Sequence, residues 1–94
     1  MKKEELNYLL NIIKKAKKIE EEKIQKKICL AKKNKIFKEF HFYNEGNGTY
    51  SPELSDMLNI LTRDFVISSL TENENKFYSL TSVGESLLKS ETNK

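Results

Sequence analysis

The stretch that decides the fold is residues 50–83, YSPELSDMLNILTRDFVISSLTENENKFYSLTSV. Ser51 can cap a helix, Pro52 fits the first helical position and Glu53 suits the first turn. An apolar stripe at helical spacing follows, formed by Leu54, Met57, Leu58 and Leu61. The pattern predicts a helix that begins after Ser51 and ends near Arg63.

The second part of this stretch predicts a hairpin followed by a last helix. Residues 65–67 and 77–80 are rich in aromatic and β-branched side chains, and the polar, turn-prone residues 71–75 separate them. Thr81 is expected to cap a short closing helix that carries Val83, Leu87 and Leu88. Residues 91–94 are expected to form a disordered tail.

Two more helices are predicted before residue 50. Residues 4–18 carry one apolar stripe at helical spacing, formed by Leu6, Leu9, Leu10, Ile13 and Ala16. Residues 20–33 start with three glutamates, which suit a helix N-terminus, and carry a stripe of Ile24, Ile28 and Ala31. Residues 36–43 predict a short extended piece because aromatic residues alternate there, and residues 44–48 predict a loop.

The first predicted helix has a second apolar side, formed by Tyr8, Ile12 and Ile19. A helix that is apolar on two sides is usually central to a core or buried in an oligomer. One explanation is therefore a dimer contact through these three residues, which predicts a homodimer. The other is that the hairpin or the last helix covers them, and the sequence leaves both open.

The order of these elements is helix, helix, extended piece, helix, hairpin, helix. A hairpin does not bury a face alone, so the helices must supply its other layer. We therefore predict one mainly helical α+β domain over residues 1–94, a winged helix-turn-helix with a two-stranded wing and a short C-terminal helix.

Three short motifs carry a family likeness. Residues 77–84, FYSLTSVG, look like the strand-to-helix step of many prokaryotic winged-helix regulators. Residues 48–54, GTYSPEL, and the Gln25-Lys26 pair resemble motifs of small prokaryotic winged-helix proteins related to the Panacea antitoxin domain, although Thr49 replaces the usual proline. The resemblance implies the fold and a regulatory setting, and it implies no catalytic residue.

Charge is divided unevenly along the chain, whose net charge is +3. Residues 1–39 hold thirteen Lys and six Glu, a net charge of +7, whereas residues 40–94 have a net charge of −4. Such asymmetry favours a polyanionic partner on the first half, and nucleic acid is the commonest one.

If the third helix reads a DNA groove, its exposed side supplies the base contacts. The candidate nucleic-acid-binding residues are Ser55, Asn59, Thr62 and Arg63 on this helix, Lys76 on the wing, and Lys14, Lys18, Lys23, Lys26, Lys27 and Lys33 on the first two helices. However, the segment 53–64 has a net charge of −2, and the wing carries Glu72 and Glu74 against Lys76. The standard docking surface is therefore poor in positive charge, and the lysines before it are either a phosphate contact or a solvated surface.

Two functions follow from these features. The first is a DNA-binding protein acting as a small transcription regulator. The alternative is a protein-interaction module, antitoxin-like or an adaptor, without sequence-specific DNA binding. DNA and a protein thus both remain open as partners.

Catalysis, a metal site and a cofactor are not expected. His41 is the single histidine and Cys29 the single cysteine, so His/Cys metal clusters and an internal disulfide are ruled out. Cys29 is expected to be a small buried thiol, and His41 to have a structural or exposed role. No apolar run approaches the roughly 20 residues of a membrane span, and no signal peptide is expected, so a cytoplasmic location is predicted.

Overall fold

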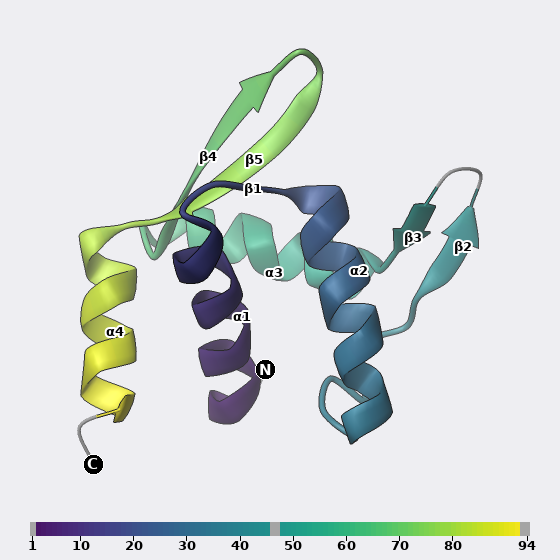
Figure 1. Ribbon diagram of the computed structural model, residues 1–94, viewed down its shortest axis with the longest axis horizontal. Helices are drawn as coiled ribbons and strands as arrows, with labels where there is room; N and C mark the ends of the chain where they lie inside the picture. Colours follow the sequence, from purple (N-terminus) through teal and green to yellow (C-terminus); the bar gives the residue numbers. More distant parts are fainter. Residues whose placement is uncertain (1, 46–47, 93–94) are drawn as a thin grey trace.

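The computed structural model describes residues 2–45 and 48–92, which form a small α+β domain (Figure 1). Its elements, in chain order, are α1 (Lys3–Ala16), β1 (Ile19–Glu20), α2 (Glu21–Ala31), the 3-10 helix η1 (Lys32–Asn34), β2 (Tyr43–Glu45), β3 (Gly48–Tyr50), α3 (Pro52–Arg63), β4 (Ile67–Glu72), β5 (Asn75–Leu80) and α4 (Ser82–Thr92). The predicted helices and the long hairpin are confirmed as elements, and α3 ends at Arg63 as expected.

A three-stranded antiparallel sheet is formed in the order β1-β5-β4. The hairpin β4–β5 is longer than predicted, because residues 71, 72 and 75 lie in its strands and pair across it. Asn73 and Glu74 alone make the turn, both with positive φ, 50° and 69°. Two such residues suit the right-handed twist of a hairpin, so strand pairing outweighs the polar composition that had indicated a longer loop.

The hairpin projects beyond the helices (Figure 1). In the same view α1, α2 and α4 run roughly parallel to one another, and α3 crosses behind them. A second, two-stranded sheet, β2–β3, lies beside α2, remote from α4. The hairpin β4–β5 is therefore presented to solvent along much of its length, and every residue of β4 after Ile67 is exposed.

The core lies between the helices and the base of this hairpin. It is built from α1, α2, α3, the segment before β2, the hairpin and α4. Its fully buried members are Leu9, Leu10, Ile13, Ile24, Ile28, Phe37, Leu54 and Leu58, and Ile67, Tyr78 and Leu88 are almost as deeply buried. The predicted α3 stripe is confirmed, since Leu61 is also buried and Met57 packs against the core. Of the stripe predicted for the first helix, Ala16 is exposed.

Tyr78 connects the sheet to α2 through a side-chain hydrogen bond. Its ring is buried, and its hydroxyl donates to Glu21 Oε1 at 2.9 Å. Burial and the adjacent Glu21 carboxylate both disfavour the phenolate, so they raise the pKa of Tyr78 far above its ordinary value.

Ile19 corrects one part of the predicted dimer stripe. Ile19 belongs to β1, pairs with Tyr78 of β5 and is only 4% exposed. Helix α1 ends at Ala16 because Lys17 takes a positive φ of 65°. The prediction of one helix through residue 18 and another from residue 20 was therefore wrong at this junction. For Ile19, the alternative in which the hairpin covers the residue is the one observed.

Residues 36–42 correct a second prediction, since they contain no strand. Phe37 is fully buried with a positive φ of 58°, and its backbone N–H donates to Glu5 Oε2 at 2.5 Å. The other carboxylate oxygen of Glu5 accepts from the backbone N–H of Lys2 at 3.0 Å. The extended pieces instead lie at 43–45 and 48–50, so the predicted piece is extended only at its last residue, Tyr43, and the strands take in both ends of the predicted loop 44–48.

Helix α4 begins as predicted, after Thr81. Thr81 Oγ1 accepts from the backbone N–H of Gly84 at 3.1 Å, and its hydroxyl lies within donating distance of the carbonyl oxygens of Phe65, at 2.5 Å, and Val66, at 2.8 Å. Residues 91–92 continue α4, contrary to the predicted disordered tail, while 93–94 lie outside the described residues. No helix in the described part of the chain combines the length and apolar character that a membrane span requires.

We predict that Gly84→Ala destabilises the domain by about 1–3 kcal/mol, because overpacking a buried position forces its neighbours apart. A Cβ at residue 84 would overlap the backbone oxygen of Val66 and lie 2.5 Å from Leu80 Cδ1. Chemical denaturation of this variant measures the loss. The exposed Ser86→Ala on the same helix is the matched control, and an unchanged or higher midpoint for Gly84→Ala would contradict the packing argument.

Candidate nucleic-acid interface

A buried amide fixes the start of α3. Gln25, 2% exposed on α2, accepts from the backbone N–H of Ser51 through Oε1 at 2.9 Å and donates through Nε2 to the Ser51 carbonyl at 3.5 Å. Ser51 is itself fully buried, and its Oγ accepts from the backbone N–H of Leu54 at 3.3 Å. The predicted helix cap is thus confirmed, and α2 holds the residue that provides it.

Glu53 extends this anchor to the segment before it. Its carboxylate accepts from the backbone N–H of His41 at 2.8 Å and from the Ser51 hydroxyl at 3.1 Å. The His41 ring is exposed, with Nδ1 3.7 Å from the second oxygen of Glu53. These hydrogen bonds, first among them the one from His41, lower the pKa of Glu53 from its ordinary value of 4.5.

The side of α3 that faces solvent carries Asn59 and Arg63, as predicted. The other two predicted residues of this helix, Ser55 and Thr62, are half-buried on its flank. Thr62 donates its hydroxyl to the Leu58 carbonyl at 2.8 Å, so that proton is committed within the helix. Asn59 and Arg63 are therefore the stronger candidates for contacts with base edges.

Lys76 links the hairpin β4–β5 to this face of α3. Its Nζ lies 3.4 Å from Asn59 Oδ1 and 5.6 Å from the centre of the Tyr78 ring. Lys18, just after α1, reaches the other strand of the hairpin, with Nζ 2.6 Å from Glu72 Oε1, and lies over the Phe77 ring at 4.9 Å. The exposed side of α3 and the face of the hairpin that carries Lys76 thus form one surface, comprising Asn59, Arg63 and Lys76, which we call the α3–wing surface after the predicted wing. Glu72 and Phe77, which contact Lys18, lie on the opposite face of the hairpin.

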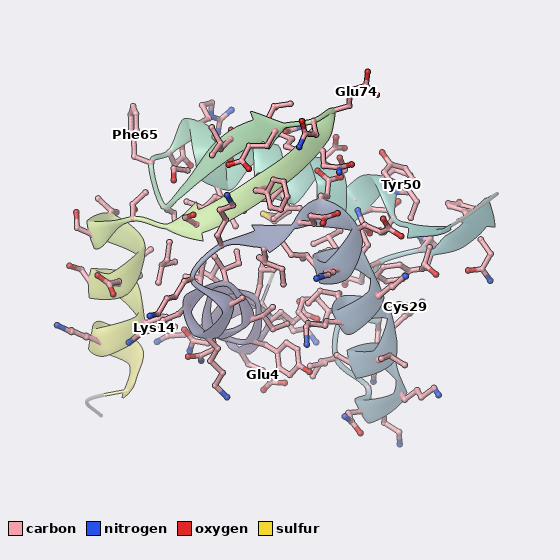
Figure 2. All side chains as sticks on the ribbon, turned by 45° about the horizontal axis from the view of Figure 1, so that its top comes forward. Glu4, Lys14, Cys29, Tyr50, Phe65 and Glu74 are labelled. Carbon is pink, nitrogen blue, oxygen red and sulfur yellow. The ribbon has the colours of Figure 1, made fainter. Side chains whose placement is uncertain are left out.

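Acidic residues border this surface. Glu53, Asp56 and Asp64 are exposed on or beside α3, and Glu74 stands at the tip of the hairpin (Figure 2). Arg63 Nε lies 3.3 Å from Asp64 Oδ1, which neutralises part of its charge. The shortage of positive charge inferred from the sequence therefore persists in three dimensions.

The predicted lysines fall into separate groups rather than on one face. Lys14 lies on the side of α1 toward α4, where it borders a hollow with Lys17, Leu80 and Glu85 (Figure 2). Lys23, Lys26 and Lys33 are exposed along α2 and η1, and Lys26 pairs with Glu22 at 3.5 Å. Lys76 lies on the hairpin, and Lys18 forms an ion pair and a cation–π contact with it.

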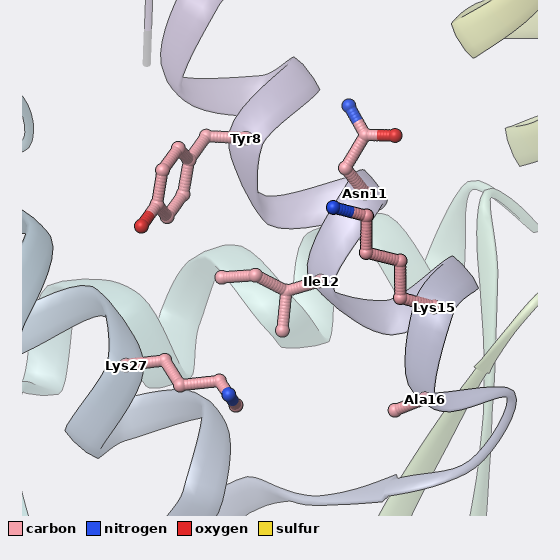
Figure 3. Close-up of a pocket in the computed structure, with 6 residues that line it drawn as sticks. All are labelled: Tyr8, Asn11, Ile12, Lys15, Ala16 and Lys27. Atoms are coloured by element: carbon pink, nitrogen blue, oxygen red, sulfur yellow. The ribbon is translucent and has the colours of Figure 1, made fainter.

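Lys27 borders a groove between α1 and α2 of about 660 Å³ (Figure 3). We call it the α1–α2 groove, and its lining residues are Tyr8, Asn11, Ile12, Lys15, Ala16 and Lys27. It contains the two remaining members of the predicted dimer stripe, Tyr8 and Ile12. Neither the hairpin nor α4 lines it, so this part of the stripe is left uncovered within the described residues.

Some positions differ from what their residue types predicted. Cys29 is half-buried rather than buried. The hydrogen bonds between Gln25 and Ser51 could not be predicted from sequence, because the two residues are 26 positions apart and no local pattern signals their contact. Across the described residues, no three His, Cys, Asp or Glu side chains come together as a metal site would require.

Comparison of the chain with protein-family models, with curated proteins and with solved structures finds no match.

We predict that Gln25→Leu destabilises the domain by about 1–3 kcal/mol, because it leaves the buried N–H of Ser51 without a partner. The Ser51 carbonyl loses one of its two donors and keeps the other, the backbone N–H of Ser55. Urea denaturation measures the loss, and Lys26→Ala, exposed at the next position of α2, is the control. A Gln25→Leu variant as stable as the wild type would show that the amide does not hold α3.

The lowered pKa of Glu53 predicts that the stability of the domain depends on pH. Its pKa is lowered on folding, so its contribution is complete above the ordinary value of 4.5 and is lost as the pH falls through the lower folded value. Wild type should therefore lose more stability than Glu53→Gln between neutral pH and about pH 3. Thermal denaturation across this range measures the difference. Glu74→Gln at the hairpin tip is the control, and parallel curves for wild type and Glu53→Gln would disprove the assignment.

Proposed function

We propose that the domain is a winged helix that acts as a small DNA-binding regulator. The topology supports the fold, because helices α1 to α3 pack on a sheet whose hairpin β4–β5 projects as a wing. In such a domain α2 and α3 are the helix pair of a helix-turn-helix, here separated by η1 and the small β2–β3 sheet.

The observation that carries the DNA-binding proposal is the contact between Lys76 and Asn59. It brings the wing beside the exposed face of α3, which is the arrangement needed for a helix to enter the major groove while the wing follows the backbone. Asn and Arg are also the side chains that read adenine and guanine best. We therefore assign base contacts to Asn59 and Arg63.

Phosphate contacts fall to the cations on and around the wing. Lys76 lies on the wing beside Asn59, and Lys18 lies against the opposite face of the wing, over Phe77. Lys23 is exposed on the first turn of α2, which directly follows β1 of the same sheet. Lys14 and Lys33 lie elsewhere and have no part in this mode of binding. Lysine supplies point charges rather than bidentate base recognition, so these contacts position the duplex without reading its sequence.

The acids beside α3 set the strength of binding. Glu53, Asp56 and Asp64 outnumber Arg63, and each repels phosphate. Because phosphate-driven affinity falls steeply with salt, we expect binding at low ionic strength that is much weaker at physiological salt.

A titration of labelled duplex DNA at about 50 and about 200 mM salt tests the proposal. We expect Asn59→Ala and Arg63→Ala each to weaken binding by about 5- to 100-fold, the effect of losing one good base contact. Asp56→Asn should strengthen binding, because it removes a charge that repels the backbone.

Lys33→Ala is the control, since it removes a positive charge away from the α3–wing surface. Equal losses for Lys33→Ala and Arg63→Ala would indicate contact through diffuse charge and would refute groove reading by α3. The absence of binding to any duplex at low salt would refute DNA binding altogether.

A second candidate function is a winged-helix protein-interaction module, antitoxin-like or an adaptor. The net negative charge of α3 favours it, because an acidic exposed helix suits a basic protein surface better than a duplex. The DNA titration separates the two functions, since this one requires no DNA affinity.

A further inference from the structure

The α1–α2 groove is distinct from the α3–wing surface and has an apolar floor. Ile12 is half-buried at its centre, and Tyr8 retains 39% of its exposure at one end (Figure 3). The Tyr8 ring is held edge-on against the buried Phe37, with ring centres 5.8 Å apart. The floor is therefore preorganised, which lowers the entropic cost of binding a partner.

The walls of the groove are positively charged on both sides. Lys15 extends from α1 and Lys27 from α2, and no carboxylate is among the described lining residues. Neither of these lysines forms an ion pair with another described residue, in contrast to Lys26, which pairs with Glu22. The site thus combines an apolar floor with unneutralised cations on opposite walls.

This charge arrangement argues against a second copy of the chain in the groove. In a two-fold dimer the same patch of each copy meets the other, so Lys15 and Lys27 would be brought against their counterparts. Like charges opposed in an interface cost binding energy. The homodimer through Tyr8 and Ile12 that the sequence predicted is accordingly disfavoured.

Duplex DNA also fits the groove poorly. A phosphate backbone satisfies Lys15 and Lys27 but has no apolar group to cover Tyr8 and Ile12. A helix with apolar residues on one side and acids on both flanks satisfies the floor and the walls together.

We propose that the α1–α2 groove binds an acidic amphipathic helix of a partner protein. Apolar residues spaced i, i+4 along that helix cover Ile12 and Tyr8, and its flanking carboxylates pair with Lys15 on one side and Lys27 on the other. The small side chain of Ala16 leaves one end of the groove open, so the helix continues past it. This site is independent of the DNA-binding proposal, because it shares none of the residues assigned there.

A charge-exchange experiment tests the proposal on the full chain. The probe is a fluorescein-labelled helical peptide of roughly 15 residues, the length at which isolated helices become stable. It carries Leu at i, i+4 spacing and Glu on both flanks, and a matched peptide carries Lys in place of each Glu. Fluorescence anisotropy measures the affinity of each peptide for each variant.

We expect wild type to bind the Glu peptide at least about tenfold more tightly than the Lys peptide, because the Lys peptide replaces two attractive charge pairs by two repulsive ones. The double variant Lys15→Glu/Lys27→Glu should reverse this preference. The double variant Lys14→Glu/Lys33→Glu makes the same charge change at exposed positions outside the groove and should keep the wild-type preference. Ala16→Trp, at an exposed position that leaves the core intact, should obstruct the groove and abolish binding of both peptides.

Several results would overturn the proposal. Binding of neither peptide by wild type, equal binding of both peptides, or the same behaviour of the two double variants would each exclude the groove as an acidic-helix site. Displacement of the Glu peptide by duplex DNA would identify the lysines as a nucleic-acid surface. Light scattering that shows a dimer in wild type and a monomer in Ala16→Trp would identify a second copy as the occupant.

Discussion

The hydrogen bonds between the Gln25 amide and the backbone of Ser51 hold the start of α3 against α2. Both residues are buried, so no bulk water replaces these bonds when they break. Gln25 belongs to α2 and Ser51 caps α3, which means that one side chain relates the two helices although a long connection separates them in sequence. The orientation of Asn59 and Arg63, and their position beside the wing, depends on this anchor.

The domain presents two surfaces of opposite electrostatic character. The α3–wing surface is polar and bordered by acids, whereas the α1–α2 groove is apolar at its floor and cationic at its walls. The positively charged first half of the chain supplies the groove, and the negatively charged second half supplies the α3–wing surface. The excess of lysine therefore does not lie where a winged helix usually meets DNA. The two proposed sites share no residue.

The parts of the fold that were predictable from sequence are those with local causes. Ser51 and Pro52 start α3 through contacts within one turn, and the apolar spacing of α3 follows from its single buried side. The strand β1 was not predictable, because its pairing partner in β5 is far away in sequence and its two residues continue a helical pattern. Likewise, the buried Phe37 takes its left-handed conformation with a hydrogen bond to Glu5 that no short-range pattern encodes. The exposed side of α3 was predictable, whereas the groove depends on how α1 and α2 pack.

The short segment after α1 has a consequence for regulation. Ala16 lines the groove, and Lys18, two residues later, contacts Glu72 and Phe77 of the wing. A partner that shifts the end of α1 therefore also shifts a residue on which the wing rests. If it does so, occupancy of the groove and affinity for DNA are thermodynamically linked, and the coupling free energy is the same in both directions. DNA then changes the affinity for the partner by the same factor by which the partner changes the affinity for DNA.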